Sequence, residues 1–232
     1  MKRNIITLLI TVFAMLQATA QTYDNLWKQA DIIAQKDQPK SEIGVMKKII
    51  SKATAAKDYG QLLAAEIRQA ILWREISPDS LTPNVKRMET EALKAKDPVL
   101  KAVRYAVLGK VYRDMNEKKS EEFFKKALEQ PELLARNASA GYVPLTLKGV
   151  DGSSFNNDLL HLIGFEADSK EAYHLMYTYY NKVGNRGAAC LCAYKLIEKY
   201  RQDDVREVRK SKYLNTIDSL IHVYQDIPEA GE

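Results

Sequence analysis

The fold is clearest between residues 155 and 200, which read FNNDLLHLIGFEADSKEAYHLMYTYYNKVGNRGAACLCAYKLIEKY. An acid- and amide-rich start opens one apolar helix, and in the two segments that follow, apolar residues recur at intervals of three and four. That spacing places an apolar stripe on one face of each helix. Gly184 and Asn185 interrupt the period where a helix would end in a left-handed cap. The stretch therefore predicts helices paired as an antiparallel hairpin.

Helix and turn signals alternate in the same way upstream. Turns are indicated where proline, glycine, aspartate and serine cluster, as at residues 57–60 and 77–80. Thr82-Pro83 and Asp97-Pro98 each combine an N-cap residue with proline at the first helical position. Helices thus follow one another roughly every 20 residues, as in proteins built from paired helices. We predict an all-α fold, an α-solenoid of stacked antiparallel helical hairpins.

The helical period is lost between residues 137 and 152, where ASAGYVP and GVDG predict a loop. We therefore expect a first helical-repeat block over residues 21–136, a connecting loop over 137–152 and a second block over 153–232. The last four residues resemble the start of another helix, so we expect the second block to be truncated at Glu232.

Residues 1–20 have the pattern of a secretory signal peptide. Lys2 and Arg3 precede the apolar run 5–16, and the small residues 18–20 form a cleavage site before Gln21. The apolar run is shorter than the roughly 20 residues that span a bilayer. We expect an exported protein, periplasmic or associated with a Gram-negative type of cell envelope. No integral membrane segment is expected after signal removal.

The charge balance argues against a nucleic-acid partner. Lys and Arg number 35 against 30 Asp and Glu, a formal net charge of +5. Loss of Lys2 and Arg3 with the signal peptide leaves 33 against 30, or +3. Basic and acidic residues are interleaved, as in EEFFKK at 121–126, which is typical of solvated helix faces. We therefore expect no nucleic-acid binding.

Four oxygen-bearing side chains before one helix are candidate calcium ligands. These are Asp151, Ser153, Asn156 and Asp158. Their spacing lacks the carboxylate density and the terminal glutamate of an EF-hand loop. The alternative is that Ser153 or Ser154 simply caps the helix. We expect the capping role and no bound metal.

The three histidines do not have the spacing of a metal site or a catalytic motif. No nucleophile elbow, phosphate loop or dinucleotide-binding fingerprint occurs in the sequence. An enzyme would need a cleft around Asp158, His161 and His174. We predict instead that the chain is not an enzyme and has no catalytic, cofactor-binding or metal-binding residues. His161 and His174 are expected to be half-buried hydrogen-bonding residues.

The cysteines and tryptophans are expected to pack in the core. Cys190 and Cys192 are two positions apart, so on a helix they point to different faces and cannot easily bond to each other. A Cys-x-Cys metal or redox site has no nearby histidine or second pair to support it. Trp27, Trp73 and the 13 tyrosines could line a groove for a peptide or glycan, but aromatic residues at helical spacing usually pack inside.

Two segments resemble the tetratricopeptide repeat. The first is LGKVY at 108–112 with the residues that follow it, although Glu121 stands where the repeat usually has a small residue. In the second, Tyr179 and Ala188 are nine apart as in the repeat, but Met176 replaces its glycine. The resemblance implies helical hairpins that bind partners on a concave face.

A wider resemblance covers nearly the whole mature chain. The segments that carry it are YDNLWK at 23–28, DQPKS at 37–41, FNNDLLHLIG at 155–164 and YYNKVGNRGAA at 179–189. They resemble the N-terminal helical region of bacterial α-macroglobulin-like envelope proteins. The resemblance implies that proteases are trapped by other parts of such proteins: β-sandwich domains, a bait region and a Cys-x-Glu-Gln thioester. Neither cysteine here begins that motif, so trapping is not carried over.

Two functions follow as hypotheses. The first is a non-enzymatic, exported helical-repeat scaffold or interaction module, the N-terminal part of an α-macroglobulin-like protease-inhibitor-type envelope protein. Its partner would be the rest of a longer chain or another envelope protein. The alternative is a free-standing periplasmic tetratricopeptide-like adaptor that binds peptides or assembly partners.

Overall fold

The protein is all-helical over the residues that its structure describes. The computed structural model describes residues 22–113, 115–143, 145, 151–203 and 218–228. Over these residues it contains α-helices, two short 3₁₀ helices and one isolated antiparallel bridge between Ala138 and Asp158, with no strand. The predicted all-α class is confirmed. The predicted signal peptide, residues 1–20, lies outside the described residues.

The chain divides into two compact units, the first ending at Leu81 and the second beginning at Thr82. This division differs from the predicted blocks 21–136 and 153–232. Helices from both sides of the 137–152 segment pack against one another inside the second unit, so that segment does not separate two compact bodies there.

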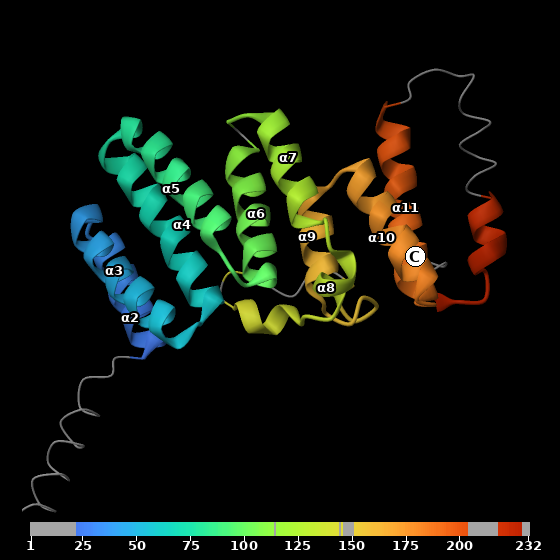
Figure 1. Cartoon of the computed structure of the whole chain (residues 1–232), viewed down its shortest axis with the longest axis horizontal. Coiled ribbons are helices and arrows are strands. Elements are labelled where there is room, and N and C mark those ends of the chain that lie inside the picture. The colour runs from blue at the N-terminus through green and yellow to red at the C-terminus, as the bar shows by residue number, and fades with distance from the viewer. Residues whose placement is uncertain (1–21, 114, 144, 146–150, 204–217, 229–232) are drawn as a thin grey trace, which may run out of the picture. The chain divides into compact units, whose positions relative to one another are not determined.

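The first unit is a row of three helices in which each packs against the next (Figure 1). Its core combines one apolar face from each helix, with Met46 and Ile49 fully enclosed. Trp27 and Trp73 pack against this core, as the sequence predicts. The elements are α2 (Tyr23–Ala34), α3 (Pro39–Ala56), α4 (Tyr59–Ile76) and the 3₁₀ helix η1 (Pro78–Ser80).

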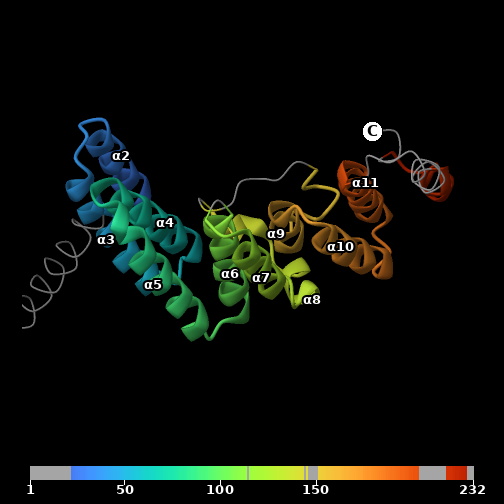
Figure 2. The ribbon, with the colours of Figure 1, turned by 90° about the horizontal axis from the view of Figure 1, so that it is seen from above.

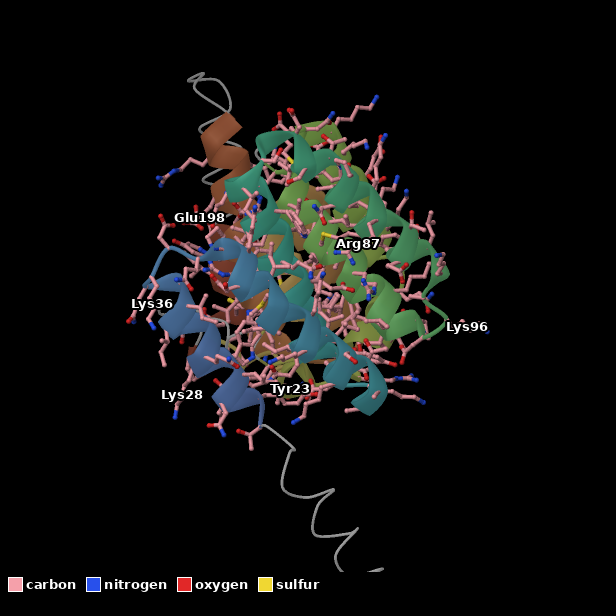
Figure 3. The ribbon with its side chains drawn as sticks, turned by 90° about the vertical axis from the view of Figure 1, so that its left-hand side faces the viewer. Tyr23, Lys28, Lys36, Arg87, Lys96 and Glu198 are labelled. Atoms are coloured by element: carbon pink, nitrogen blue, oxygen red, sulfur yellow. The ribbon has the colours of Figure 1, made fainter. Side chains whose placement is uncertain are left out.

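Local sequence explains where these helices begin and end. The Thr22 hydroxyl accepts a hydrogen bond from the Asn25 N–H, and the Asp58 carboxylate accepts one from the Gln61 N–H. Each side chain thereby satisfies a donor that has no partner within its own helix. Pro39 occupies the first turn of α3, where its missing N–H is not needed. The charged side chains of Lys28 on α2 and of Lys36 in the turn after it point outward, away from the core (Figure 3).

One buried ion pair joins α3 to α4. Glu42 is only 3% exposed, and its two carboxylate oxygens accept hydrogen bonds from Arg68 Nε at 2.6 Å and Nη2 at 3.2 Å. This hydrogen bond raises the pKa of Arg68, while partial burial acts in the opposite direction. The pair holds the two helices in a fixed register.

We expect Glu42→Gln to lower the free energy of unfolding of the first unit by about 1 kcal/mol. The substitution removes the charge-assisted pair but leaves Arg68 partly accessible to water, so the loss is smaller than for a fully enclosed pair. Chemical denaturation followed by circular dichroism measures the effect. Lys48→Gln, an exposed change on the same helix, is the control and should have almost no effect. Equal losses from both variants would contradict the role given to the pair.

The second unit contains the remaining helices. Helix α6 packs against α7, α10 packs against α11, and α9 contacts α6, α7, α8 and α10 (Figures 1 and 2). Residues 218–224 are also helical. The elements are α5 (Leu81–Lys94), α6 (Pro98–Tyr112), α7 (Glu117–Ala127), α8 (Pro131–Ala135), η2 (Ser139–Tyr142), α9 (Leu159–Ala167), α10 (Lys170–Lys182) and α11 (Arg186–Asp203).

One predicted cap is confirmed and another is wrong. Asp97 caps α6 by accepting hydrogen bonds from the N–H groups of Val99 and Leu100, with Pro98 at the first helical position. Thr82 does not cap α5, because that helix begins at Leu81, directly after η1. Pro83 therefore lies within the first turn of α5, where the N–H that it lacks would have no intrahelical partner.

Helices α6 and α7 approach each other closely at Gly109. A side-chain carbon placed on Gly109 would lie 2.7 to 2.9 Å from three ring atoms of Phe124. The Ser120 hydroxyl is buried here and donates a 2.7 Å hydrogen bond to the Gly109 carbonyl. The small residue at this close contact is therefore Ser120. It lies one position before Glu121, where the tetratricopeptide pattern would place a small residue.

Among the residues described, no helix combines the length and the apolar character needed to cross a lipid bilayer.

Candidate functional site

Asp158 is the polar centre of the second unit. It is 2% exposed and caps α9, with Oδ1 accepting a 2.8 Å hydrogen bond from the His161 N–H. The Tyr180 hydroxyl on α10 lies 2.9 Å from both carboxylate oxygens and donates to them. One carboxylate thus joins the start of α9 to the last turn of α10.

Aromatic rings enclose this carboxylate. The Phe155 and His161 rings are stacked with their centroids 4.1 Å apart, and the Tyr180 ring meets Phe155 edge-on at 5.2 Å. The Phe165 ring meets both stacked rings edge-on, with its centroid 5.4 Å from that of Phe155 and 4.5 Å from that of His161. Because these rings exclude water, burial raises the pKa of Asp158 to about 6, partly opposed by its hydrogen bonds. Burial and the neighbouring Asp158 carboxylate also raise the pKa of Tyr180.

The residues proposed for an enzymatic cleft are only partly brought together. Asp158, the cap of α9, and His161 on α9 are both buried, whereas His174 lies exposed on α10. His161 is more deeply buried than the predicted half-buried state, at 1% exposure. A carboxylate and an imidazole enclosed by aromatic rings offer no surface to a substrate. The arrangement is suited to holding α9 and α10 together.

The predicted capping role of Ser153 or Ser154 is wrong, because Asp158 caps α9. Residues 151–157 form turns in which Asn156 and Asn157 adopt left-handed backbone conformations, with φ values of 57° and 53°. Asparagine tolerates this region better than most residues. Of the calcium-ligand candidates, Asp158 directs its carboxylate into the protein interior. No group of three acidic, histidine or cysteine side chains suited to a metal occurs among the residues described.

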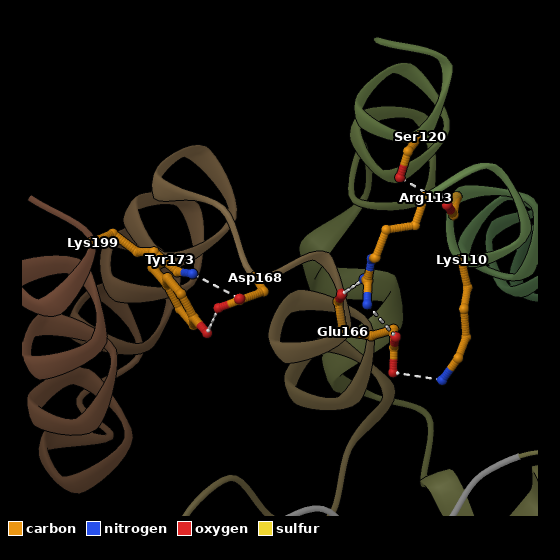
Figure 4. A network of polar contacts seen from close by, with 8 residues as sticks. Lys110, Arg113, Ser120, Glu166, Asp168, Tyr173 and Lys199 are labelled. Carbon is orange, nitrogen blue, oxygen red and sulfur yellow. Dashed lines mark hydrogen bonds and ion pairs between the residues drawn. The ribbon is translucent and has the colours of Figure 1, made fainter. Parts of the chain in front are cut away.

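Polar contacts connect the end of α9 to helices on either side (Figure 4). Glu166 accepts hydrogen bonds from Lys110 Nζ of α6 and from Nη1 of Arg113, the residue after α6, each at 3.1 Å. Asp168 accepts from the Tyr173 hydroxyl at 2.8 Å and from Lys199 Nζ at 2.6 Å. Burial acts to raise the pKa of Asp168, but the bonds from Lys199 and Tyr173 lower it. These contacts link α6, α9, α10 and α11.

The two cysteines differ in environment. Cys192 is fully buried, while Cys190 is partly exposed. Burial, with a smaller contribution from Asp158, raises the pKa of the Cys192 thiol well above its usual range. The core role predicted for Cys192 is confirmed.

We expect Cys192 to stay unmodified when the native protein is treated with iodoacetamide at pH 8. A buried thiol with a raised pKa forms little of the reactive thiolate. Mass spectrometry of digested protein, with and without prior denaturation, measures the modification at each cysteine. Rapid native modification of Cys192 would contradict the packing described for α11.

A cavity of about 220 Å³ opens between the start of α6, the end of α7 and α8. Its lining includes Tyr105, Lys101 and Lys126, with apolar contributions from Pro98, Ala102 and Leu133. The volume is below the roughly 300 Å³ of the smallest usual ligand pockets. It has room for a side chain of a partner rather than for a cofactor.

Sequence reasoning did not identify these cavity residues. The signal that could have found them is a repeated spacing, since Tyr105 and Tyr112 are seven apart, as are Lys119 and Lys126.

Comparisons of this chain with protein-family models, with curated proteins and with solved structures found no match.

Proposed function

We propose that the chain is a non-enzymatic, exported helical-repeat module that binds protein partners. The observation that carries this proposal is the pairing of consecutive helices, α3 with α4, α6 with α7 and α10 with α11. Successive helical hairpins with short turns are typical of solenoids, whose stacked helices present an extended surface to partners. The burial of Asp158 and His161 supports a structural use of these reactive groups.

The context that we propose is the N-terminal part of an α-macroglobulin-like envelope protein. The supporting features are the sequence resemblance at 23–28, 37–41, 155–164 and 179–189 and the signal-peptide pattern at 1–20. In that setting the module scaffolds or docks the domains that trap proteases. The alternative context is a free-standing periplasmic adaptor that binds peptides or assembly partners.

An antibody raised against this chain tests both location and context. We expect it to detect the native protein in the envelope or periplasmic fraction and not in the cytoplasm, because of the signal peptide. A band several times heavier than this chain supports the macroglobulin-like context. A band near the mass of this chain supports the adaptor and contradicts the macroglobulin-like context. Retention in the cytoplasm contradicts export. A cytoplasmic marker protein on the same blot is the control for fractionation.

A further inference from the structure

At two places, seven residues apart along each helix, a lysine of α7 lies beside a tyrosine ring of α6. In the first copy, Lys119 Nζ lies 4.6 Å from the centre of the Tyr112 ring. It also lies 3.1 Å from the Tyr112 hydroxyl and 3.3 Å from the Glu89 carboxylate of α5. The Tyr112 hydroxyl donates a 2.7 Å hydrogen bond to the same carboxylate. An acidic side chain therefore completes this lysine-and-tyrosine pair.

The second copy has the lysine and the aromatic rings without the acid. Lys126 Nζ lies 5.9 Å from the centre of the Tyr105 ring and 5.3 Å from that of Phe123. The Phe123 ring lies between the two tyrosines, 6.0 Å from Tyr105 and 5.5 Å from Tyr112. Among the described residues, no carboxylate lies within ion-pairing distance of Lys126 or Lys101.

The second copy faces the cavity between α6, α7 and α8, which gives it access to a partner. Lys101 and Lys126 supply two positive charges to the lining, and Glu129 supplies one exposed negative charge. The ring faces hold the Lys126 ammonium in place without neutralising it. An added carboxylate would gain charge-assisted hydrogen bonds from preplaced donors.

We propose that this cavity is a socket for an acidic side chain, aspartate or glutamate, of an extended partner polypeptide. The partner carboxylate takes the place that Glu89 takes in the first copy, where it accepts hydrogen bonds from the lysine ammonium and the tyrosine hydroxyl. Apolar residues beside the partner acid contact Pro98, Ala102 and Leu133. The proposal rests on the protein-binding function proposed above and names the chemistry that the partner presents.

Fluorescence anisotropy with short dye-labelled peptides, blocked at both ends, tests the socket on the full chain. The probe carries one glutamate between two leucines, and a second peptide carries glutamine in its place. We expect the glutamine peptide, and separately Lys126→Gln and Lys101→Gln, to weaken binding about tenfold each, as expected for loss of a charged hydrogen bond. Binding is also expected to weaken as salt is raised.

Lys125→Gln is the matched control, because Lys125 is exposed on the same helix and does not line the cavity. It should leave affinity unchanged, and circular dichroism should show equal helix content in every variant. Equal binding of the two peptides, or equal losses from Lys125→Gln and Lys126→Gln, would overturn the socket. Preference for a glutamine peptide with a free C-terminal carboxylate would overturn the side-chain assignment.

Photo-crosslinking in cells separates failure of the socket from failure of the proposed function. Identical crosslinked partners for the native chain and Lys126→Gln would overturn the socket and leave the binding module standing. Absence of any crosslinked partner with either chain would count against the binding module itself.

Discussion

Asp158→Ala is expected to lower the free energy of unfolding of the second unit by about 3 to 4 kcal/mol, the largest effect of any substitution considered. It removes the acceptor for the His161 N–H and the Tyr180 hydroxyl, both buried. Each buried donor left without an acceptor costs about 1 to 3 kcal/mol. Loss of the helix cap adds to this.

Asp158→Asn is expected to be tolerated, because an amide oxygen can still cap α9 and the amide N–H can donate to Tyr180.

The raised pKa of Asp158 also predicts that the stability of the second unit depends on pH. The pKa of Asp158 is raised from 3.8 to about 6, so the folded state binds this proton more tightly than the unfolded state. Its contribution to stability is therefore complete below about pH 4 and is lost as the pH rises to about 6. Between these pH values, the free energy of unfolding contributed by Asp158 changes by on the order of 3 kcal/mol.

Urea denaturation of the native chain, Asp158→Ala and Asp158→Asn between pH 4 and pH 7.5 measures both effects. Above pH 6 we expect Asp158→Asn to be at least as stable as the native chain, and its stability should change less with pH. Hydrogen exchange at the α9 amides localises the loss in Asp158→Ala. A native stability that rises steeply between pH 4 and pH 6 because of Asp158, or an alanine variant as stable as the asparagine variant, would contradict this account.

Gly109→Ala is expected to lower the free energy of unfolding of the second unit by about 2 kcal/mol, although alanine normally favours a helix by about 1 kcal/mol over glycine. The added methyl group would lie 2.7 Å from the Phe124 ring, which is itself 5% exposed and cannot move freely. Separating α6 from α7 to admit the methyl group would stretch the hydrogen bond from Ser120 to the Gly109 carbonyl.

Gly141→Ala is the matched control within the same unit, since nothing lies within 4 Å of the position that its side-chain carbon would occupy. It should change stability by no more than about 0.5 kcal/mol. Denaturation of both variants by guanidinium, followed by circular dichroism, gives the comparison. A Gly109→Ala protein as stable as the native chain would show that α6 and α7 are not in close contact at this point.

Local signals allowed much of the helical structure to be predicted. The cap at Asp97 and the break at Gly184, whose φ is +78°, depend on neighbouring residues alone. The turn at 57–60 was predicted, but its left-handed residue is Lys57, and Asp168 ends α9 in the same conformation, where glycine is the usual signal. The start of α5 was mispredicted because η1 runs directly into it and removes the need for a cap at Thr82.

The site was harder to predict because its residues are far apart in the sequence. The acid-rich segment before α9 was recognised, but the burial of Asp158 depends on Tyr180, which lies 22 positions later. The cavity joins Lys101 on α6 to Lys126 on α7 and to Leu133 on α8. Helical periodicity predicts which face of each helix is apolar, but it does not specify which neighbouring helix that face meets.

The pairing of consecutive helices has a consequence for how the protein folds. Helices α3 and α4 are separated by only two residues, and α10 and α11 by three, so most of their contacts join residues close in the chain. Proteins rich in such local contacts have low contact order and fold rapidly, because little loop-closure entropy opposes each pairing. Contacts of α9 with α6 span more of the chain. We therefore expect the hairpins to form first and the packing of α9 against α6 to follow in a later, slower step.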